Sequence, residues 1–130
     1  MKERLMIVED QLINMLGALI AFNEGGNIEV GDVHATIAGA LKMIDEFKPT
    51  VALLDIHLKD GLSTEVAKVL DEKSIPYLYV TGVGDLSHGR IDAIEIQDKN
   101  FKTIESFDSI DKGVKIWQKA FEILKERKNL

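Results

Sequence analysis

Polar residues that could bind a metal or accept a phosphoryl group follow short apolar runs of the sequence. They are Glu9 and Asp10 after residues 5–8, Asp55 after residues 51–54, Thr81 after residues 76–80 and Lys99 after residues 93–97. Carboxylates that lie close together repel each other, and a hard divalent cation such as Mg²⁺ relieves this repulsion. A carboxylate can also act as a nucleophile that accepts a phosphoryl group, whose oxygens a hydroxyl and an ammonium group then neutralise. These residue types predict a Mg²⁺-dependent phosphoacceptor site if the fold brings them together.

The elements that would bring these residues together form an alternating series. Strands are predicted at residues 5–8, 27–30, 51–54, 76–80 and 93–97, and helices at residues 12–22, 37–47, 62–72, 110–124 and, short and irregular, 86–91. The run 51–54 is apolar throughout, as expected of a strand buried on both faces. In residues 110–124, apolar side chains recur every three or four positions, as in a helix. The alternation predicts an α/β fold: a flavodoxin-like, doubly wound, five-stranded parallel sheet of order 2-1-3-4-5, with helices on both faces.

The predicted strand order decides where the polar residues meet. In a doubly wound sheet the ligand site lies beyond the carboxyl ends of the strands, where the strand order reverses. The first and third strands are neighbours at that point, so Glu9, Asp10 and Asp55 are expected to converge. Thr81 would lie at the end of the fourth strand, and Lys99 beyond the end of the fifth.

The composition limits the classes of protein to which the chain can belong. Its 130 residues suit one domain over residues 1–130, with no output domain. A formal net charge of −6 argues against a nucleic-acid surface, and the absence of cysteine excludes thiolate chemistry. The sequence shows neither a signal peptide nor an apolar run that could cross a membrane, so a cytoplasmic protein without membrane contact is expected.

Four segments of the chain resemble the signature regions of response-regulator receiver domains. They are residues 5–10, 51–55, 79–82 and 99–101. The resemblance implies a phosphoacceptor in a two-component system or phosphorelay, which takes its phosphoryl group from a sensor histidine kinase or a histidine phosphotransferase. It would signal to a downstream target protein through a conformational change, and it would not be an enzyme beyond its own phosphorylation and dephosphorylation. Residues 76–84 also resemble a subgroup of single-domain receivers that is common in alphaproteobacteria.

The same resemblance assigns roles to individual residues. It implies that Asp55 is the phosphoacceptor and that Glu9 and Asp10 bind Mg²⁺ together with Asp55 and the backbone carbonyl of His57. Thr81 would be the switch hydroxyl, and Lys99 the lysine that pairs with the phosphoryl group.

Three departures from the family pattern keep a second interpretation open. Lys99 is followed by Asn100 where proline is usual, and Lys102 is a weaker candidate for the lysine. The stretch between Thr81 and Lys99 is short, and Ile96 stands where an aromatic switch residue is usual. These departures favour a pseudo-receiver, a protein-binding module that keeps the fold but does not switch by phosphorylation. The intact acidic residues favour the phosphoacceptor.

The first and last predicted helices carry more apolar residues than one core-facing stripe needs. The additional residues include Leu16, Leu19 and Ile20 in the first helix, and Ile116, Ala120 and Ile123 in the last. This surplus predicts either an extensive core contact or a surface for a homodimer or another protein partner.

Overall fold

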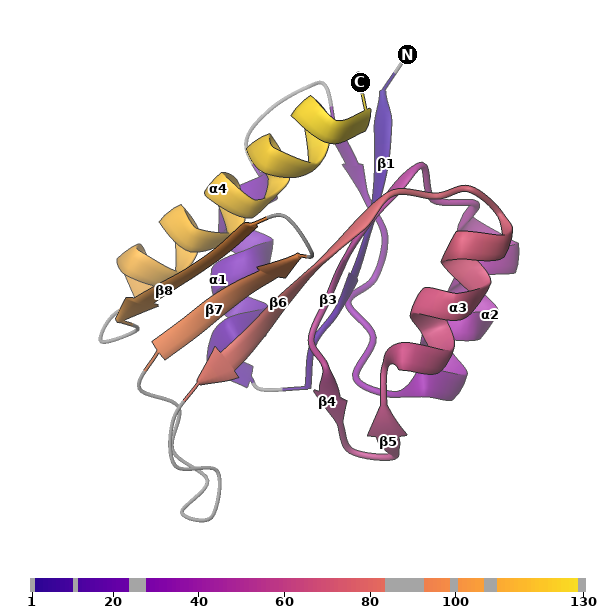
Figure 1. Cartoon of the computed structure of the whole chain (residues 1–130), viewed down its shortest axis with the longest axis horizontal. Helices are drawn as coiled ribbons and strands as arrows, with labels where there is room; N and C mark the ends of the chain where they lie inside the picture. Colours follow the sequence, from indigo (N-terminus) through magenta and orange to yellow (C-terminus); the bar gives the residue numbers. More distant parts are fainter. Residues whose placement is uncertain are drawn as a thin grey trace.

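A mostly parallel sheet with helices on both faces makes up most of the protein (Figure 1). The computed structural model describes residues 2–10, 12–23, 28–83, 93–98, 101–106 and 110–128. In chain order its elements are β1 (Glu3–Val8), α1 (Leu12–Asn23), β2 (Ile28–Val30), α2 (Ile37–Phe47), β3 (Val51–Leu54), β4 (His57–Leu58), β5 (Gly61–Leu62), α3 (Thr64–Glu72), β6 (Tyr77–Val83), β7 (Ala93–Asp98), β8 (Phe101–Ser106) and α4 (Ile110–Lys128).

Four parallel strands lie in the order β2-β1-β3-β6. This arrangement confirms the predicted order 2-1-3-4 for the first four strands of a flavodoxin-like sheet. The register places Val8 of β1 opposite Leu54 of β3, and Leu54 opposite Tyr79 of β6. The carboxyl ends of β1 and β3 are therefore level with each other.

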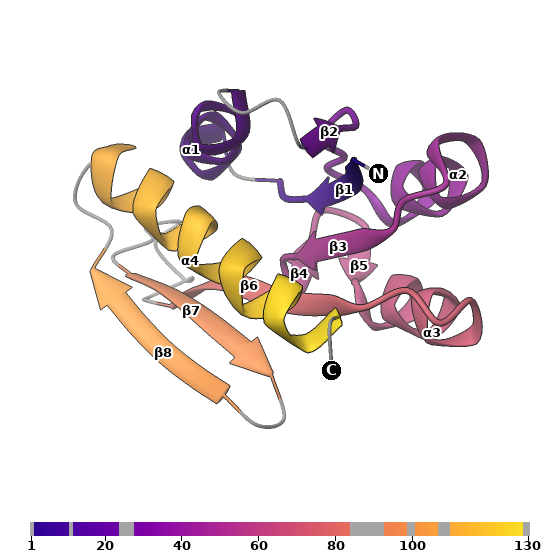
Figure 2. The same cartoon turned by 90° about the horizontal axis from the view of Figure 1, so that it is seen from above.

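Alternating side chains of the central strands fill two separate cores. Leu5 and Ile7 of β1 pack with α1 and α4 on one face, whereas Met6 and Val8 pack with α2 and α3 on the other. Figure 2 shows the two helix pairs on opposite sides of the strands. Because β3 is buried along its whole length, it holds the adjoining Asp55, which is itself buried, at a fixed position.

The prediction of a five-stranded, fully parallel sheet is wrong beyond β6. Both β7 and β8 are antiparallel to their neighbours. The additional strand β8 makes the sheet six-stranded and forms its edge in place of β7. Only nine residues, 84–92, connect β6 to β7, and a parallel crossover needs roughly a dozen or more. Two residues, 99 and 100, connect β7 to β8, which suits a hairpin. The predicted helix at residues 86–91 lies outside the described residues.

Local signals fix both ends of α2. The Thr36 side chain caps its first turn by accepting the N–H of Gly39 at 3.0 Å. Lys48 ends the helix in the left-handed conformation, with a φ of 55°. The sequence then continues with Pro49, which cannot extend a helix from this point.

Candidate functional site

Three carboxylates meet at the carboxyl ends of β1 and β3. Glu9 and Asp10 directly follow β1, and Asp55 directly follows β3. One oxygen from each of the three lies within 4.8 Å of the other two. Glu9 is 1% exposed and Asp55 is 5% exposed, whereas Asp10 is partly exposed. The structure thus brings together the three acidic residues that the sequence singles out.

Backbone hydrogen bonds hold these residues in place. The Asp55 N–H donates to the Val8 carbonyl at 2.8 Å, which joins the two strand ends. The Glu9 N–H donates to the His34 carbonyl at 2.9 Å, and the Asp10 N–H donates to Oε1 of Glu9 at 3.1 Å. The acidic residues are therefore fixed by the sheet rather than by a long loop.

The donor set fits a hard divalent cation. Burying a carboxylate costs free energy unless hydrogen bonds or a positive charge compensate it. Two nearly buried acids and a third at the surface are all oxygen ligands, which Mg²⁺ prefers. Asp10 is the partly exposed member of this acidic cluster, so one side of the cluster faces solvent.

Of the other predicted site residues, His57 and Thr81 are described by their backbone positions. The backbone of His57 begins β4, two residues after Asp55. Thr81 lies in β6 opposite Glu95 of β7, two residues beyond Tyr79, which pairs with the last residue of β3. Thr81 thus lies on β6, the strand next to β3, just beyond the level of the carboxyl end of β3. The side chains of His57 and Thr81 lie outside the described part of the structure.

Lys99 itself lies outside the described residues, but the strand that leads to it is described. Ala93 lies opposite Val83, and Gln97 lies opposite Tyr79, so β7 runs back toward the amino end of β6. The expected position of Lys99 at the carboxyl edge of the sheet assumed a parallel strand, and that assumption is wrong. The predicted aromatic position, Ile96, lies opposite Val80.

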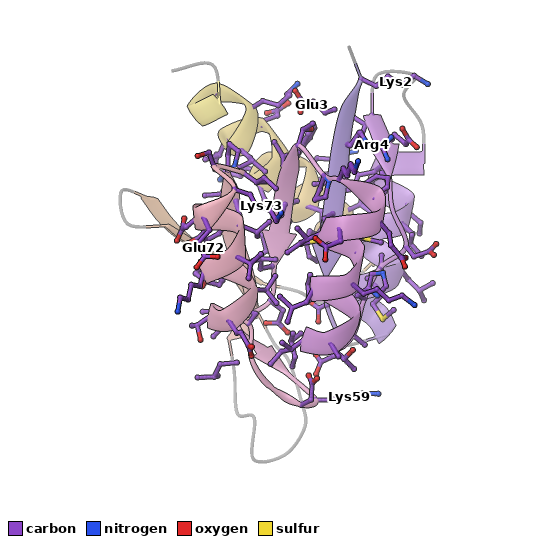
Figure 3. The ribbon with its side chains drawn as sticks, turned by 90° about the vertical axis from the view of Figure 1, so that its right-hand side faces the viewer. Lys2, Glu3, Arg4, Lys59, Glu72 and Lys73 are labelled. Carbon is purple, nitrogen blue, oxygen red and sulfur yellow. The ribbon has the colours of Figure 1, made fainter. Side chains whose placement is uncertain are left out.

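A small hairpin after Asp55 was not predicted. Strands β4 and β5 pair antiparallel, with His57 opposite Leu62 and Leu58 opposite Gly61. Figure 3 shows Lys59, next to its tip, at the end of the molecule opposite Lys2 and Arg4. The sequence did contain a local signal for this hairpin, because Gly61, which follows the turn residues Lys59 and Asp60, has a φ of 141° that favours glycine.

Tyr79 on β6 lies beside the end of β3 and faces α2 and α3. Burial raises the pKa of the Tyr79 phenol, and the negative charge of Asp71 raises this pKa further. Tyr79 therefore stays protonated at neutral pH and is no candidate for a general base near the acidic cluster.

The two helices with surplus apolar residues differ in how these residues are buried. In α4, Ile116 and Ala120 are buried, and Ile123 packs against the same core. The interpretation as a core contact is therefore confirmed for α4. In α1, Leu16, Leu19 and Ile20 are 40–53% exposed. An open surface pocket of about 430 Å³ includes Leu19 in its lining, together with Met15, Phe22, Val30, Gly31, Asp32 and Val33.

Comparison with known proteins supports the resemblance found in the sequence. No family model matches the chain. Over 74 residues, 56% of the chain, it is 32% identical to an uncharacterized response regulatory protein of Vibrio parahaemolyticus serotype O3:K6. That match spans 30% of the relative, less than a third of its length.

Solved structures give the same result for the fold. The signal receiver domain of NarL from Mycobacterium tuberculosis superposes with a TM-score of 0.52 at 25% identity, over 62% of this chain and 64% of that one. The phosphorylated cyanobacterial phytochrome response regulator RcpA superposes with a TM-score of 0.68 at 13% identity, over 98% of this chain and 96% of that one. The chain therefore resembles response-regulator receiver domains in fold and, over part of its length, in sequence.

Among the described residues, no helix has both the length and the apolar character that a membrane crossing requires.

Proposed function

We infer that this protein is a phosphoacceptor receiver of a two-component system or phosphorelay, with Asp55 as the acceptor. The observation that carries this inference is the cluster of Glu9, Asp10 and Asp55 at the ends of two adjacent parallel strands. Its partners would be a sensor histidine kinase or a histidine phosphotransferase as donor, and a downstream protein as target. We expect the reaction in the cytoplasm, where such ATP-dependent kinases act.

The reaction needs little covalent chemistry from the protein. A carboxylate oxygen of Asp55 attacks the phosphorus of a phosphohistidine, so that an O–P bond forms and the N–P bond breaks. The electron pair of the N–P bond stays on the imidazole nitrogen. Asp55 lies beside Val8 through a backbone hydrogen bond of 2.8 Å, which keeps the nucleophile in one position.

A magnesium ion held by Glu9, Asp10, Asp55 and the His57 carbonyl would neutralise charge on the phosphoryl oxygens. The hydroxyl of Thr81, in the carboxyl-terminal half of β6, is our candidate donor to one of these oxygens. Lys99 is not included, because β7 leads away from the carboxyl edge of the sheet.

Intact-protein mass after incubation with acetyl phosphate and Mg²⁺ tests this function. We expect a phosphoryl adduct in the wild type and none in Asp55→Asn, which keeps the size of the side chain but removes the nucleophilic oxygen pair. Samples without metal, and a phosphohistidine donor in place of acetyl phosphate, complete the experiment. An adduct that persists in Asp55→Asn would place the acceptor elsewhere.

A pseudo-receiver is the second candidate, and the direction of β7 is the observation that favours it. A receiver that lacks a lysine at the acidic cluster has lost one of the charges that hold a phosphoryl group. If neither donor phosphorylates the wild type and the protein binds its partner in the same way with and without donor, the pseudo-receiver explains the chain better.

A further inference from the structure

The β4–β5 hairpin is fixed to the beginning of α2 by the side chain of Asp60. Both carboxylate oxygens of Asp60 accept the N–H of Ile37, at 2.9 and 3.1 Å. Ile37 is the first residue of α2, and the N–H groups of a first turn have no partner within the helix. Thr36 already caps Gly39, so Asp60 provides a second cap from a segment 23 residues away in sequence. Its negative charge also lies at the positive end of the helix dipole.

Two further contacts fix the same hairpin. Leu58 is 8% exposed and belongs to the core between the sheet and helices α2 and α3. Gly61 has a φ of 141°, and a Cβ at this position would lie 3.1 Å from Cδ1 of Ile37. The hairpin therefore lies against α2 closely enough that a side chain at position 61 would disturb it.

The hairpin is also connected to the acidic cluster. It starts two residues after Asp55, and the N–H of Ser63 donates to the Ile56 carbonyl at 2.8 Å, which closes the segment on itself. The loop before α2 joins the other acidic strand end, because the His34 carbonyl accepts the Glu9 N–H. The start of α2 is thus linked to both backbone segments that carry the acidic residues.

We propose that Asp60 is a positioning residue of the acidic site: by accepting the first N–H of α2, it holds the β4–β5 hairpin, and with it the His57 carbonyl, beside Asp55. This proposal rests on the function proposed above and adds a residue to it. Cation binding and the Asp60–Ile37 contact are then coupled in both directions. The contact favours cation binding by holding the hairpin in place, and a bound cation favours the contact for the same reason.

Mg²⁺ titration by calorimetry tests the proposal with three variants. Asp60→Ala removes the cap, and we expect the affinity for Mg²⁺ to fall about threefold to tenfold, somewhat less than for a residue that contacts a metal ligand directly. Asp60→Asn retains one acceptor oxygen, and we expect it to restore most of the affinity. Asp32→Ala is the charge-matched control, because Asp32 is an exposed acid that follows β2 at the same end of the sheet.

Hydrogen exchange at the Ile37 amide, measured without Mg²⁺, is the second readout. We expect exchange about five- to tenfold faster in Asp60→Ala than in the wild type, as for the loss of one charge-assisted hydrogen bond. Equal Mg²⁺ affinities in Asp60→Ala and Asp32→Ala would overturn the positioning role, because the loss of one negative charge alone would then explain the change in affinity. Unchanged exchange at Ile37 would overturn the cap itself. A wild type that binds no Mg²⁺ would overturn the proposed function together with the role of Asp60.

Discussion

At the scale of single residues, burial distinguishes the three acids of the site. Glu9 and Asp55 are almost completely enclosed, and their backbone groups are part of the sheet's hydrogen bonding. Asp10 is partly exposed, and its side chain belongs to neither hydrophobic core. Asp10 is therefore the residue whose substitution tests metal binding with the least risk to folding.

We predict that Asp10→Asn weakens Mg²⁺ binding about tenfold or more, because one of three anionic ligands becomes neutral. Calorimetric titration measures the affinity, and thermal unfolding followed by circular dichroism checks that the fold is retained. Asp32→Asn, which removes the same charge from an exposed position, should change the affinity by less than about twofold. If both variants bind Mg²⁺ equally well, Asp10 is not a ligand.

At the scale of elements, the direction of β7 changes which residues can reach the site. In the antiparallel register, residues late in β7 lie beside the beginning of β6. A parallel fifth strand would have brought Lys99 to the edge where the acidic residues lie. The antiparallel direction of β7 therefore removes the basis on which Lys99, which lies outside the described residues, was expected at that edge.

We predict that Lys99→Ala forms the phosphoryl adduct at a rate within about twofold of the wild type, whereas loss of a phosphate-binding charge costs at least tenfold. The time course of the adduct mass measures the rate. Lys102→Ala, in the neighbouring strand, is expected to behave in the same way. A tenfold slower reaction in Lys99→Ala alone would show that this lysine reaches Asp55.

The sequence was sufficient for those elements whose signals are local. Apolar runs predicted three of the four parallel strands and an alternating pattern predicted the one at residues 27–30, and the acids after the first and third strands predicted the acidic cluster. The β7–β8 hairpin was missed because Lys99 and Asn100 were interpreted as a variant of the family's Lys-Pro rather than as a two-residue turn. The contact of Asp60 with Ile37 was missed for a different reason. It joins two elements far apart in sequence, and no local pattern encodes it.

At the scale of the whole molecule, polar groups occupy both ends of the central strands, with different roles. At the amino end, Nε of Arg4 donates to the Phe47 carbonyl at 3.0 Å, and its guanidinium lies 4.2 Å above the Phe47 ring. Arg4 also pairs with Glu29, and its backbone N–H donates to Thr50. Figure 3 shows this end, with Lys2, Glu3 and Arg4, far from Lys59 at the other end.

We predict that Arg4→Ala lowers the free energy of unfolding by about 1–3 kcal/mol, because it leaves the last carbonyl of α2 and Glu29 without their partner. Its affinity for Mg²⁺ should stay the same, since the acidic residues lie at the opposite end of β1. Urea denaturation followed by circular dichroism measures the stability, and Lys2→Ala is the exposed control. A large loss of Mg²⁺ affinity in Arg4→Ala would contradict the separation of the two ends.

Trp117, the single tryptophan of the chain, is completely buried in the core between the sheet and helices α1 and α4. Its indole N–H has no hydrogen-bond partner among the described residues. An indole in such a dry environment emits at short wavelength, and its fluorescence moves to longer wavelength when water reaches it. The protein therefore carries its own optical probe on the face opposite α2. Changes at the start of α2 should leave this emission unaltered, whereas separation of α1 or α4 from the sheet should shift it.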